Sequence, residues 1–193
     1  MLARENPFRS DRIESLRYEM PAAEWDDLFA RFHAHGRRGA LVGPEGVGKT
    51  TLLEDLAPYL CRMGLRPRFI RLNRRQADWK TLLDGLAGEV TGTDAVLLDG
   101  AEQLSMLQWL FFRWRTRRAG AIVVTSHGTG LLPTLRACPA CETLFGDFVA
   151  RLSGNACDGI DPVQVFRAHG GNMREAFRTL YMHAAGCVGD GQE

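Results

Sequence analysis

The residues with the clearest chemical potential form a glycine-rich octapeptide. Its pattern, G-x-x-x-x-G-K-[ST], is that of a phosphate-binding loop. The members of the octapeptide are Gly43, Pro44, Glu45, Gly46, Val47, Gly48, Lys49 and Thr50. Glycines let the main chain wrap a polyphosphate in conformations that other residues resist, and the loop amides can then point at phosphate oxygens. The spacing therefore predicts a nucleotide-binding site.

The side chains of the loop have separate tasks. We expect Lys49 to bridge the β- and γ-phosphates of ATP and Thr50 to hold Mg²⁺. Two of the 24 basic residues are lysines, Lys49 and Lys80, and one of them stands where the loop needs it. A short apolar strand over residues 39–42 precedes the loop, and a helix follows it. The first turn of that helix, including Thr51, adds unpaired N–H groups to the expected cofactor-binding residues.

Composition sets limits on the protein class. A chain of 193 residues with 45% apolar residues supports one core plus a small appendage. Its net charge of +1 predicts no overall attraction to nucleic acid, so any such binding must come from a local patch. No apolar run approaches the length of a membrane span, and the start lacks a signal-peptide pattern. We therefore expect a cytoplasmic protein without a membrane partner.

The cysteines do not suggest a structural framework. Their odd number argues against paired disulfides. The lone C-x-x-C has neither a second C-x-x-C nor a paired histidine motif to complete a zinc site, so we expect reduced thiols. The five residues are Cys61, Cys138, Cys141, Cys157 and Cys187.

Strand and helix patterns alternate from Gly39 onward. This order predicts an α/β fold in which a parallel sheet lies between helical layers. The expected strands are residues 39–42, 68–72, 95–99 and 121–126. We expect three parts: a helical lead-in over 1–38, a nucleotide-binding core over 39–140, and a small helical appendage with its tail over 141–193. Pro58 should kink or shorten the helix after the loop.

Polar residues end two of the expected strands. Asp99 closes an apolar strand at the edge where parallel sheets bind ligands, so we expect it to organise Mg²⁺ by holding a water or Thr50 on the ion. Its alternative role is to cap a helix. Thr125 and Ser126 end the fourth strand, where many ATPases with this loop place a polar contact to the γ-phosphate or attacking water. His127 could reach the same place, or simply be solvated.

A later segment adds a family resemblance. Gly171-Asn172-Met173-Arg174 opens a helix. Together with the loop, Leu97-Leu98-Asp99 and Thr125-Ser126, it resembles the AAA+ superfamily of P-loop NTPases over about residues 39–185. The resemblance implies a C-terminal helical lid, assembly with a protein partner or further copies, and an Arg174 guanidinium presented to the γ-phosphate. Arg174 could otherwise be an exposed side chain pairing with Glu175.

The chain departs from the family pattern beside Asp99. Most AAA+ proteins follow this aspartate with a glutamate that polarises the attacking water, whereas Gly100 stands here. Glu102 is the next acid, and it could act one turn further along or only favour a helix start. We name Lys49, Asp99, Glu102 and Arg174 as the catalytic residues. Losing a positioned base costs about 10²–10⁴-fold in rate, so we predict clear ATP binding with slow, partner-dependent hydrolysis.

Two arginine clusters have several interpretations. Arg113, Arg115, Arg117 and Arg118 accompany Trp109, Phe111, Phe112 and Trp114. They could supply an arginine finger to a neighbouring subunit, form a nucleic-acid surface, or be the solvated face of a helix whose aromatics are core. The last of these is the simplest. Arg71, Arg74 and Arg75 pose the same question. Small DNA-linked ATPases look most similar within the superfamily, which leaves DNA binding open.

Two other functions compete with an ATP-dependent switch. One is a P-loop kinase for a small molecule, and the other is a non-hydrolysing adaptor that keeps its nucleotide. Strand order separates ATPase from kinase. The Thr125 strand lies between the loop strand and the Asp99 strand in the ATPase, while those two strands are neighbours in the kinase. The sequence lacks the guanine-reading motif N-K-x-D but does not decide between ATP and GTP.

Overall fold

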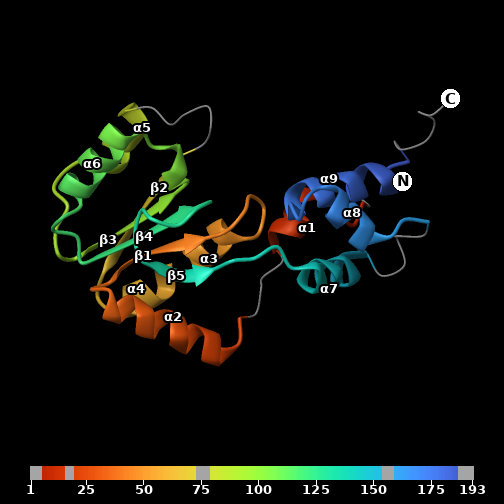
Figure 1. The fold of residues 1–193 in the computed structure, drawn as a ribbon, viewed down its shortest axis with the longest axis horizontal. Coiled ribbons are helices and arrows are strands. Elements are labelled where there is room, and N and C mark those ends of the chain that lie inside the picture. Colours follow the sequence, from red (N-terminus) through yellow and green to blue (C-terminus); the bar gives the residue numbers. More distant parts are fainter. Residues whose placement is uncertain (1–5, 16–19, 73–78, 154–158, 187–193) are drawn as a thin grey trace. The chain divides into compact units, whose positions relative to one another are not determined.

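The computed structural model describes residues 6–15, 20–72, 79–153 and 159–186 (Figure 1). By their contacts these residues form two compact units. We call residues 20–43 and 48–138 the sheet unit. Residues 1–19, 44–47 and 139–193 are the helical unit. The tip of the glycine-rich loop thus groups with the helical unit, while both ends of the loop belong to the sheet unit.

The sheet unit is built on a five-stranded sheet in which every paired neighbour is parallel. Its spatial order is β2-β3-β4-β1-β5. The strands are β1 (Arg38–Val42), β2 (Arg66–Arg71), β3 (Asp94–Asp99), β4 (Ala121–Ser126) and β5 (Thr134–Ala137). The four strands expected from the sequence are all present. The strand order also places β4 between β1 and β3, which is the arrangement of the ATPase and not of the kinase.

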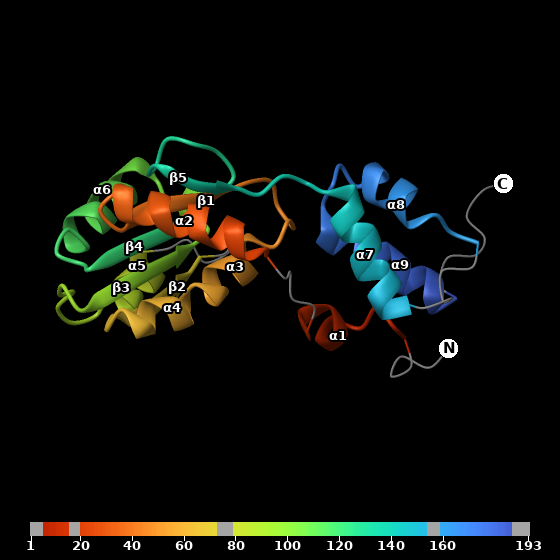
Figure 2. The same cartoon turned by 90° about the horizontal axis from the view of Figure 1, so that it is seen from below.

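Helices cover both faces of this sheet, as the alternation of buried residues requires. Val96 and Leu98 of β3 face a core that includes Leu82 and Phe112. Ala95 and Leu97, which alternate with them along β3, face a second core that includes Leu28. Figure 1 shows the sheet between two groups of helices, and Figure 2 views the same unit from the side of one of these groups. The helices on the second face are α2 (Ala22–Ala34), α3 (Lys49–Asp55) and α4 (Ala57–Arg62), and those on the first are α5 (Trp79–Gly85) and α6 (Met106–Arg115).

Three local features differ from the simplest sequence pattern. The expected long helix is broken at Leu56 into α3 and α4, and Pro58 lies in the first turn of α4, where its missing N–H is harmless. A 3₁₀ turn over Ala101–Gln103 precedes α6, which begins only at Met106. Ser105 then starts α6 with a capping box in which Gln108 is the reciprocal partner. β5 was not expected at all.

The helical unit packs three C-terminal helices around an aromatic core. They are α7 (Glu142–Ser153), α8 (Pro162–Ala168) and α9 (Met173–Ala184), and the short α1 (Ser10–Ser15) belongs to the same unit. Phe145 stacks on Phe166 at 4.9 Å between ring centroids and tilts against Phe177 at 4.8 Å. This packing confirms the expected small helical appendage after the sheet.

The N-terminal segment is part of that core. Phe8 is buried with its ring centroid 6.3 Å from that of Phe177. The amide of Asn6 donates to the carbonyl of Tyr181 at 2.8 Å, and Asn6 is 1% exposed. Among the described helices, none is long and apolar enough to cross a membrane.

Candidate functional site

The ends of the glycine-rich loop are fixed to the sheet by main-chain contacts. The N–H of Gly43 donates to the carbonyl of Ser126 at 3.1 Å, which continues the β1–β4 pairing. A Cβ at Gly43 would lie 2.1 Å from the carbonyl oxygen of Cys138, so this position requires glycine. Gly46 and Gly48 have φ values of 79° and 85°, in the left-handed region that glycine enters without strain. The loop therefore has the glycines that its backbone needs.

Lys49 begins α3 and is largely buried. Its ammonium donates to the carbonyl of Gly43 at 2.8 Å, across the base of the loop. The side chain is thereby held against the loop that it is expected to serve. Burial raises the pKa of the nearby Cys138 thiol, although the charges of Arg136 and Lys49 act in the opposite direction. Cys138 is therefore a protonated core thiol beside the loop.

Asp99 lies at the centre of a hydroxyl network. The Thr50 hydroxyl donates to Asp99 Oδ2 at 2.9 Å, and the Thr125 hydroxyl donates to Asp99 Oδ1 at 2.6 Å. The N–H of Gly100 donates to the Thr125 oxygen at 2.8 Å. One carboxylate is thus fixed from α3 and β4 at once. Thr50 and Asp99, the two expected metal-organising residues, are in direct contact, and their oxygen atoms are of the kind that Mg²⁺ prefers.

Gly100 takes the position after Asp99 where the AAA+ resemblance implies a glutamate. Its φ is 86°, in the left-handed region. A Cβ there would lie 2.9 Å from the main-chain carbonyl of Leu72. A side chain at this position would need both a strained backbone and a shift of the Leu72 carbonyl, which follows β2, so the local geometry disfavours glutamate here.

Glu102 takes a nearby position on the 3₁₀ turn after Gly100. Its Oε1 lies 3.4 Å from Nε2 of His127, which follows β4. Its Oε2 is buried and has no hydrogen-bond partner within the part of the chain that the structure describes. A buried carboxylate oxygen without a donor is costly, which marks this atom as one that a water or ligand would satisfy. The sequence named Glu102 and His127 separately but gave no sign that they would meet.

The helical unit has its own arrangement around the loop tip. Asn172 caps α9, and its Oδ1 accepts from the N–H groups of Arg174 and Glu175 at 3.1 and 3.3 Å. A Cβ at Gly46 would lie 2.2 Å from this same oxygen. Arg174 is exposed in the first turn of α9, and Glu175 pairs with Arg178 rather than with Arg174. The cap of α9 is thus in direct contact with Gly46.

The expected site residues fall into two groups. Lys49, Thr50, Thr51, Asp99, Glu102, Thr125 and Ser126 belong to the sheet unit with Gly43 and Gly48. Pro44, Glu45, Gly46, Val47 and Arg174 belong to the helical unit. Thr125 and Ser126 are 1% and 2% exposed, and the Thr125 proton is used by Asp99. A contact of Arg174 with a γ-phosphate stays a prediction.

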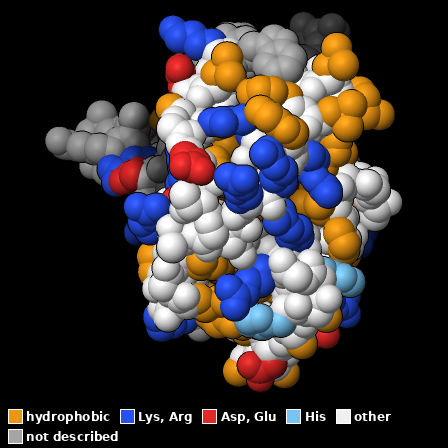
Figure 3. All heavy atoms as spheres, turned by 90° about the vertical axis from the view of Figure 1, so that its left-hand side faces the viewer, with side chains coloured by type: hydrophobic (Ala, Val, Ile, Leu, Met, Phe, Trp, Pro, Cys, Tyr) orange, Lys and Arg blue, Asp and Glu red, His pale blue; other side chains and the backbone are white. Residues whose placement is uncertain are grey.

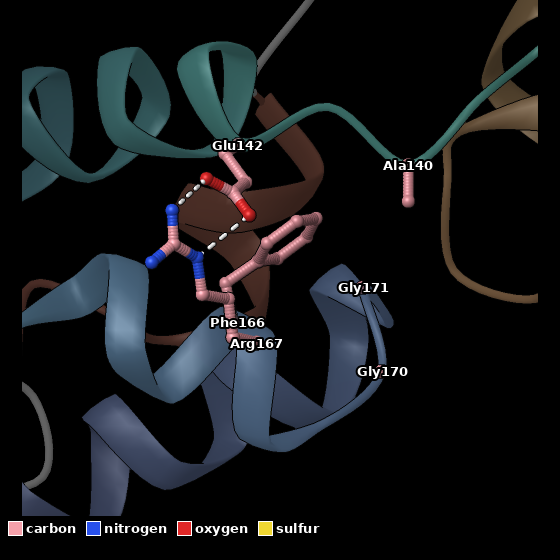
Figure 4. A pocket seen from close by; sticks show the side chains of 6 residues that line it. All are labelled: Ala140, Glu142, Phe166, Arg167, Gly170 and Gly171. Carbon is pink, nitrogen blue, oxygen red and sulfur yellow. Dashed lines mark hydrogen bonds and ion pairs between the residues drawn. The ribbon is translucent and has the colours of Figure 1, made fainter.

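The helical unit also has a recess of its own, shown in Figure 4. Its charged groups face each other. Arg167 donates twice to the Glu142 carboxylate, at 2.7 and 2.8 Å, which lowers the pKa of Glu142. Ala140, Phe166, Gly170 and Gly171 complete the lining. This ion pair therefore joins α8 to the start of α7 at the recess.

The aromatic residues that accompany the arginines of α6 differ in their burial. Phe112 is fully buried, Trp109 and Phe111 are partly buried against the same core, and Trp114 is 57% exposed. Arg115 donates to the carbonyls of Leu86 and Gly88.

Four residues of the arginine and cysteine patterns lie outside the described residues: Arg74, Arg75, Cys157 and Cys187. Within the described ranges, no three His, Cys, Asp or Glu side chains form a group that could hold a metal.

Comparisons with known proteins agree at the level of the fold. No protein-family model and no curated protein matches the chain. Among solved structures, a chain in "Structure of Drosophila ORC bound to DNA" superposes with a TM-score of 0.54 and 18% identity. The match covers 95% of this chain and 59% of that one, so this protein spans little more than half the length of the chain it resembles. The expected AAA+ resemblance is confirmed for the fold.

Proposed function

We propose that this chain, which has the AAA+ fold, is an ATP-binding switch with slow hydrolysis. The observation that carries the proposal is the meeting of Thr50, Asp99 and Thr125 next to a loop with nucleotide-binding spacing. A structural turn would need neither a lysine at position 49 nor an aspartate fixed by two hydroxyls. The strand order supports an ATPase over a kinase.

Each residue has a defined task in this proposal. The loop amides and Lys49 bind the phosphates, and the latter neutralises their charge. Thr50 and Asp99 hold Mg²⁺, which, when bound, withdraws electron density from the phosphate oxygens. Thr125 is a positioning residue, because its hydroxyl keeps the Asp99 carboxylate in one orientation. Arg174 would close on the γ-phosphate as its fork-shaped charge allows.

Glu102 is the base that we assign to the attacking water. Its buried Oε2 has an unfilled acceptor position within the described structure, and the other oxygen lies 3.4 Å from Nε2 of His127. The base comes from a turn three residues past Asp99 instead of from the strand end itself. Such a displaced base supports hydrolysis that is slower than when it follows the aspartate directly. A partner or a second copy would then be needed to bring Glu102 into line.

A non-hydrolysing adaptor is the second candidate, and one observation favours it. The left-handed conformation and close surroundings of Gly100 disfavour a glutamate directly after Asp99. If Glu102 does not serve as a base, nucleotide would remain bound as a structural ligand.

A DNA-linked role is a further part of our proposal. It is supported by the fold of a protein whose structure was solved bound to DNA.

Single-turnover hydrolysis of ATP with excess protein separates these candidates. We expect slow conversion by the parent chain and a loss of about 10²–10⁴-fold in Glu102→Gln, with ATP affinity unchanged. Glu89→Gln, at an exposed loop of the sheet unit, is the matched control and should behave like the parent. Equal rates in Glu102→Gln and the control would remove Glu102 as the base, and tight binding without conversion in all three would favour the adaptor.

A further inference from the structure

The amino-terminal edge of the sheet, opposite the loop and Asp99, holds a concentration of positive charge. The segments that lead into β1–β4 at this edge are residues 35–38, 62–68, 84–94 and 113–121. They contain nine arginines and three acids, an excess of six positive charges in a chain whose net charge is +1. The rest of the chain is therefore net negative by five. Figure 3 shows basic side chains gathered in the middle of this face.

Contacts join these arginines into one surface across the strands. Arg38 donates to the carbonyl of Arg117 at 3.0 Å. The pKa of the Arg38 guanidinium is lowered by burial and by the nearby charge of Arg113. Arg118 lies 3.6 Å from Glu89, whose carbonyl accepts from Arg68 at 3.3 Å. We call this the edge arginine surface: Arg37, Arg38, Arg62, Arg66, Arg68, Arg113, Arg115, Arg117 and Arg118.

Most of the acids at this edge are already used. Asp94 lies 3.3 Å from Arg66 and 4.0 Å from Arg68, and it accepts from Thr91. Glu89 faces Arg118. Asp84 is the third acid, against nine guanidinium groups. The surface thus keeps a large positive excess after its internal pairs are formed, and such an excess attracts an anionic partner.

Three of the guanidinium groups lie over aromatic rings. Arg117 is 5.0 Å from the ring centroid of Trp114, Arg113 is 5.8 Å from that of Trp109, and Arg62 is 5.9 Å from that of Tyr59. A guanidinium at a ring still has N–H groups along its edge that can donate to phosphate. Trp114 itself is 57% exposed. The surface therefore offers both phosphate donors and an aromatic face.

We propose that the edge arginine surface binds single-stranded nucleic acid. The arginines extend over four segments instead of surrounding one pocket, which fits a chain of phosphates better than a single phosphate. Arginine-rich grooves with exposed aromatics are how proteins hold unpaired bases without reading their sequence. A duplex would leave the Trp114 ring without a base to stack on. This inference does not rest on nucleotide binding by the glycine-rich loop.

The exposed apolar side chains at the start of α6 are not part of this surface. Met106 and Leu107 are more than two-thirds exposed, and they lie at the opposite end of the helix from Arg113 and Trp114. They offer no donors to phosphate. An anionic membrane would use both ends of α6, since it takes up apolar side chains as well as binding basic ones, and vesicle binding therefore separates this alternative from single-stranded nucleic acid.

The test is fluorescence anisotropy with a labelled oligo(dT) of about 16 nucleotides, the upper end of the usual site size. The test variant carries Arg37→Gln, Arg113→Gln and Arg118→Gln, which leaves the arginines that donate to main-chain carbonyls in place. The control carries Arg12→Gln, Arg151→Gln and Arg178→Gln, the same change of charge on exposed arginines of the helical unit. We expect the test variant alone to lose at least tenfold in affinity. Its slope of log affinity against log salt should fall by about 2.

Trp114→Ala should weaken binding to oligo(dT) without changing the salt slope, because it removes stacking and no charge. Lys49→Ala should bind oligo(dT) like the parent, which separates this inference from the proposed ATP site. The proposal is overturned if the two triple variants bind alike, if duplex DNA of the same length binds more tightly than oligo(dT), or if the protein binds phosphatidylserine vesicles but not oligo(dT).

Discussion

The hydroxyl of Thr125 donates to Asp99 at 2.6 Å while it accepts from the N–H of Gly100 at 2.8 Å. Since a hydroxyl has one proton, its donation is committed to the carboxylate. Thr125 is buried at the end of β4, between the loop strand and the Asp99 strand. The strand inserted next to the loop thus fixes the orientation of the expected magnesium-organising group.

Replacing Thr125 tests this relationship. Thr125→Val keeps the shape but leaves the Gly100 N–H and one Asp99 oxygen without their partner, a loss of about 1–3 kcal/mol. We expect a lower free energy of unfolding and a weaker dependence of ATP binding on Mg²⁺, measured by chemical denaturation and by titration over a magnesium series. Thr125→Ser retains the hydroxyl and should lie close to the parent. A valine variant with unchanged magnesium dependence would show that Asp99 does not need this bond.

The two lysines provide a matched pair for the nucleotide site. Lys49→Ala should abolish the rise in melting temperature that ATP and Mg²⁺ cause, because the buried ammonium at the base of the loop is lost. Lys80→Ala removes the same charge from α5 and should keep the full rise. Stabilisation of both variants by ATP to the same extent would place the nucleotide elsewhere.

Restoring the family's glutamate should fail. Gly100→Glu places a side chain in a left-handed conformation, which costs about 1–2 kcal/mol, and brings its Cβ within 2.9 Å of the Leu72 carbonyl. We expect lower stability and no gain in hydrolysis. Gly88 also has a positive φ, 74°, but open space around it. Gly100→Ala should therefore destabilise the protein more than Gly88→Ala, as measured by urea unfolding. Faster hydrolysis in Gly100→Glu would contradict this account of the strand end.

Asp94 gives the stability a dependence on acid pH. Burial raises its pKa, but hydrogen bonds from Thr91 and the charges of Arg66 and Arg68 lower it more, so the pKa in the folded state lies below the ordinary aspartate value. The unfolded state then takes up a proton first as the pH falls. The contribution of Asp94 is complete above the ordinary aspartate range and is lost as the pH falls through the lowered pKa.

The matching experiment compares the parent with Asp94→Asn by urea unfolding at neutral and acid pH. The variant should be less stable at neutral pH, by about 1–3 kcal/mol for a buried group with several donors. The difference should shrink as the pH falls through the lowered pKa of Asp94. A difference that is constant with pH would mean that the charge of Asp94 contributes nothing.

The sequence predicted those features that follow from local patterns. Buried strands such as 95–99 appear in the sequence as continuous apolar runs. Pro58 predicted that the helix after the loop would be interrupted, as it is between α3 and α4. The capping box of Ser105 and Gln108 has the S-x-x-Q pattern, but it was not predicted. Asp99 and Thr125 were named from their strand ends, and parallel strands bring their carboxyl ends to one edge.

What the sequence left out depends on contacts between distant segments. β5 has one buried residue, Leu135, and pairs with the sheet on one side only, so it lacks the apolar run of the inner strands. The meeting of Glu102 with His127, and that of Gly46 with Asn172, result from turns whose geometry no periodicity encodes. Gly100 stood out only as a departure, because a sequence shows which residue is present but not the carbonyl that excludes a larger one.

The hydrogen bond between Asn6 and Tyr181 has a consequence during synthesis. Its two partners are 175 residues apart, so at about 5–20 residues per second the synthesis of the chain between them takes roughly 9–35 s. The sheet unit can complete itself on the ribosome in that interval. Phe8 cannot be buried in that interval, since the aromatic rings that pack around it are synthesised after the sheet unit. Until then Phe8 is an exposed apolar side chain, which is the kind of group that a chaperone at the tunnel exit binds.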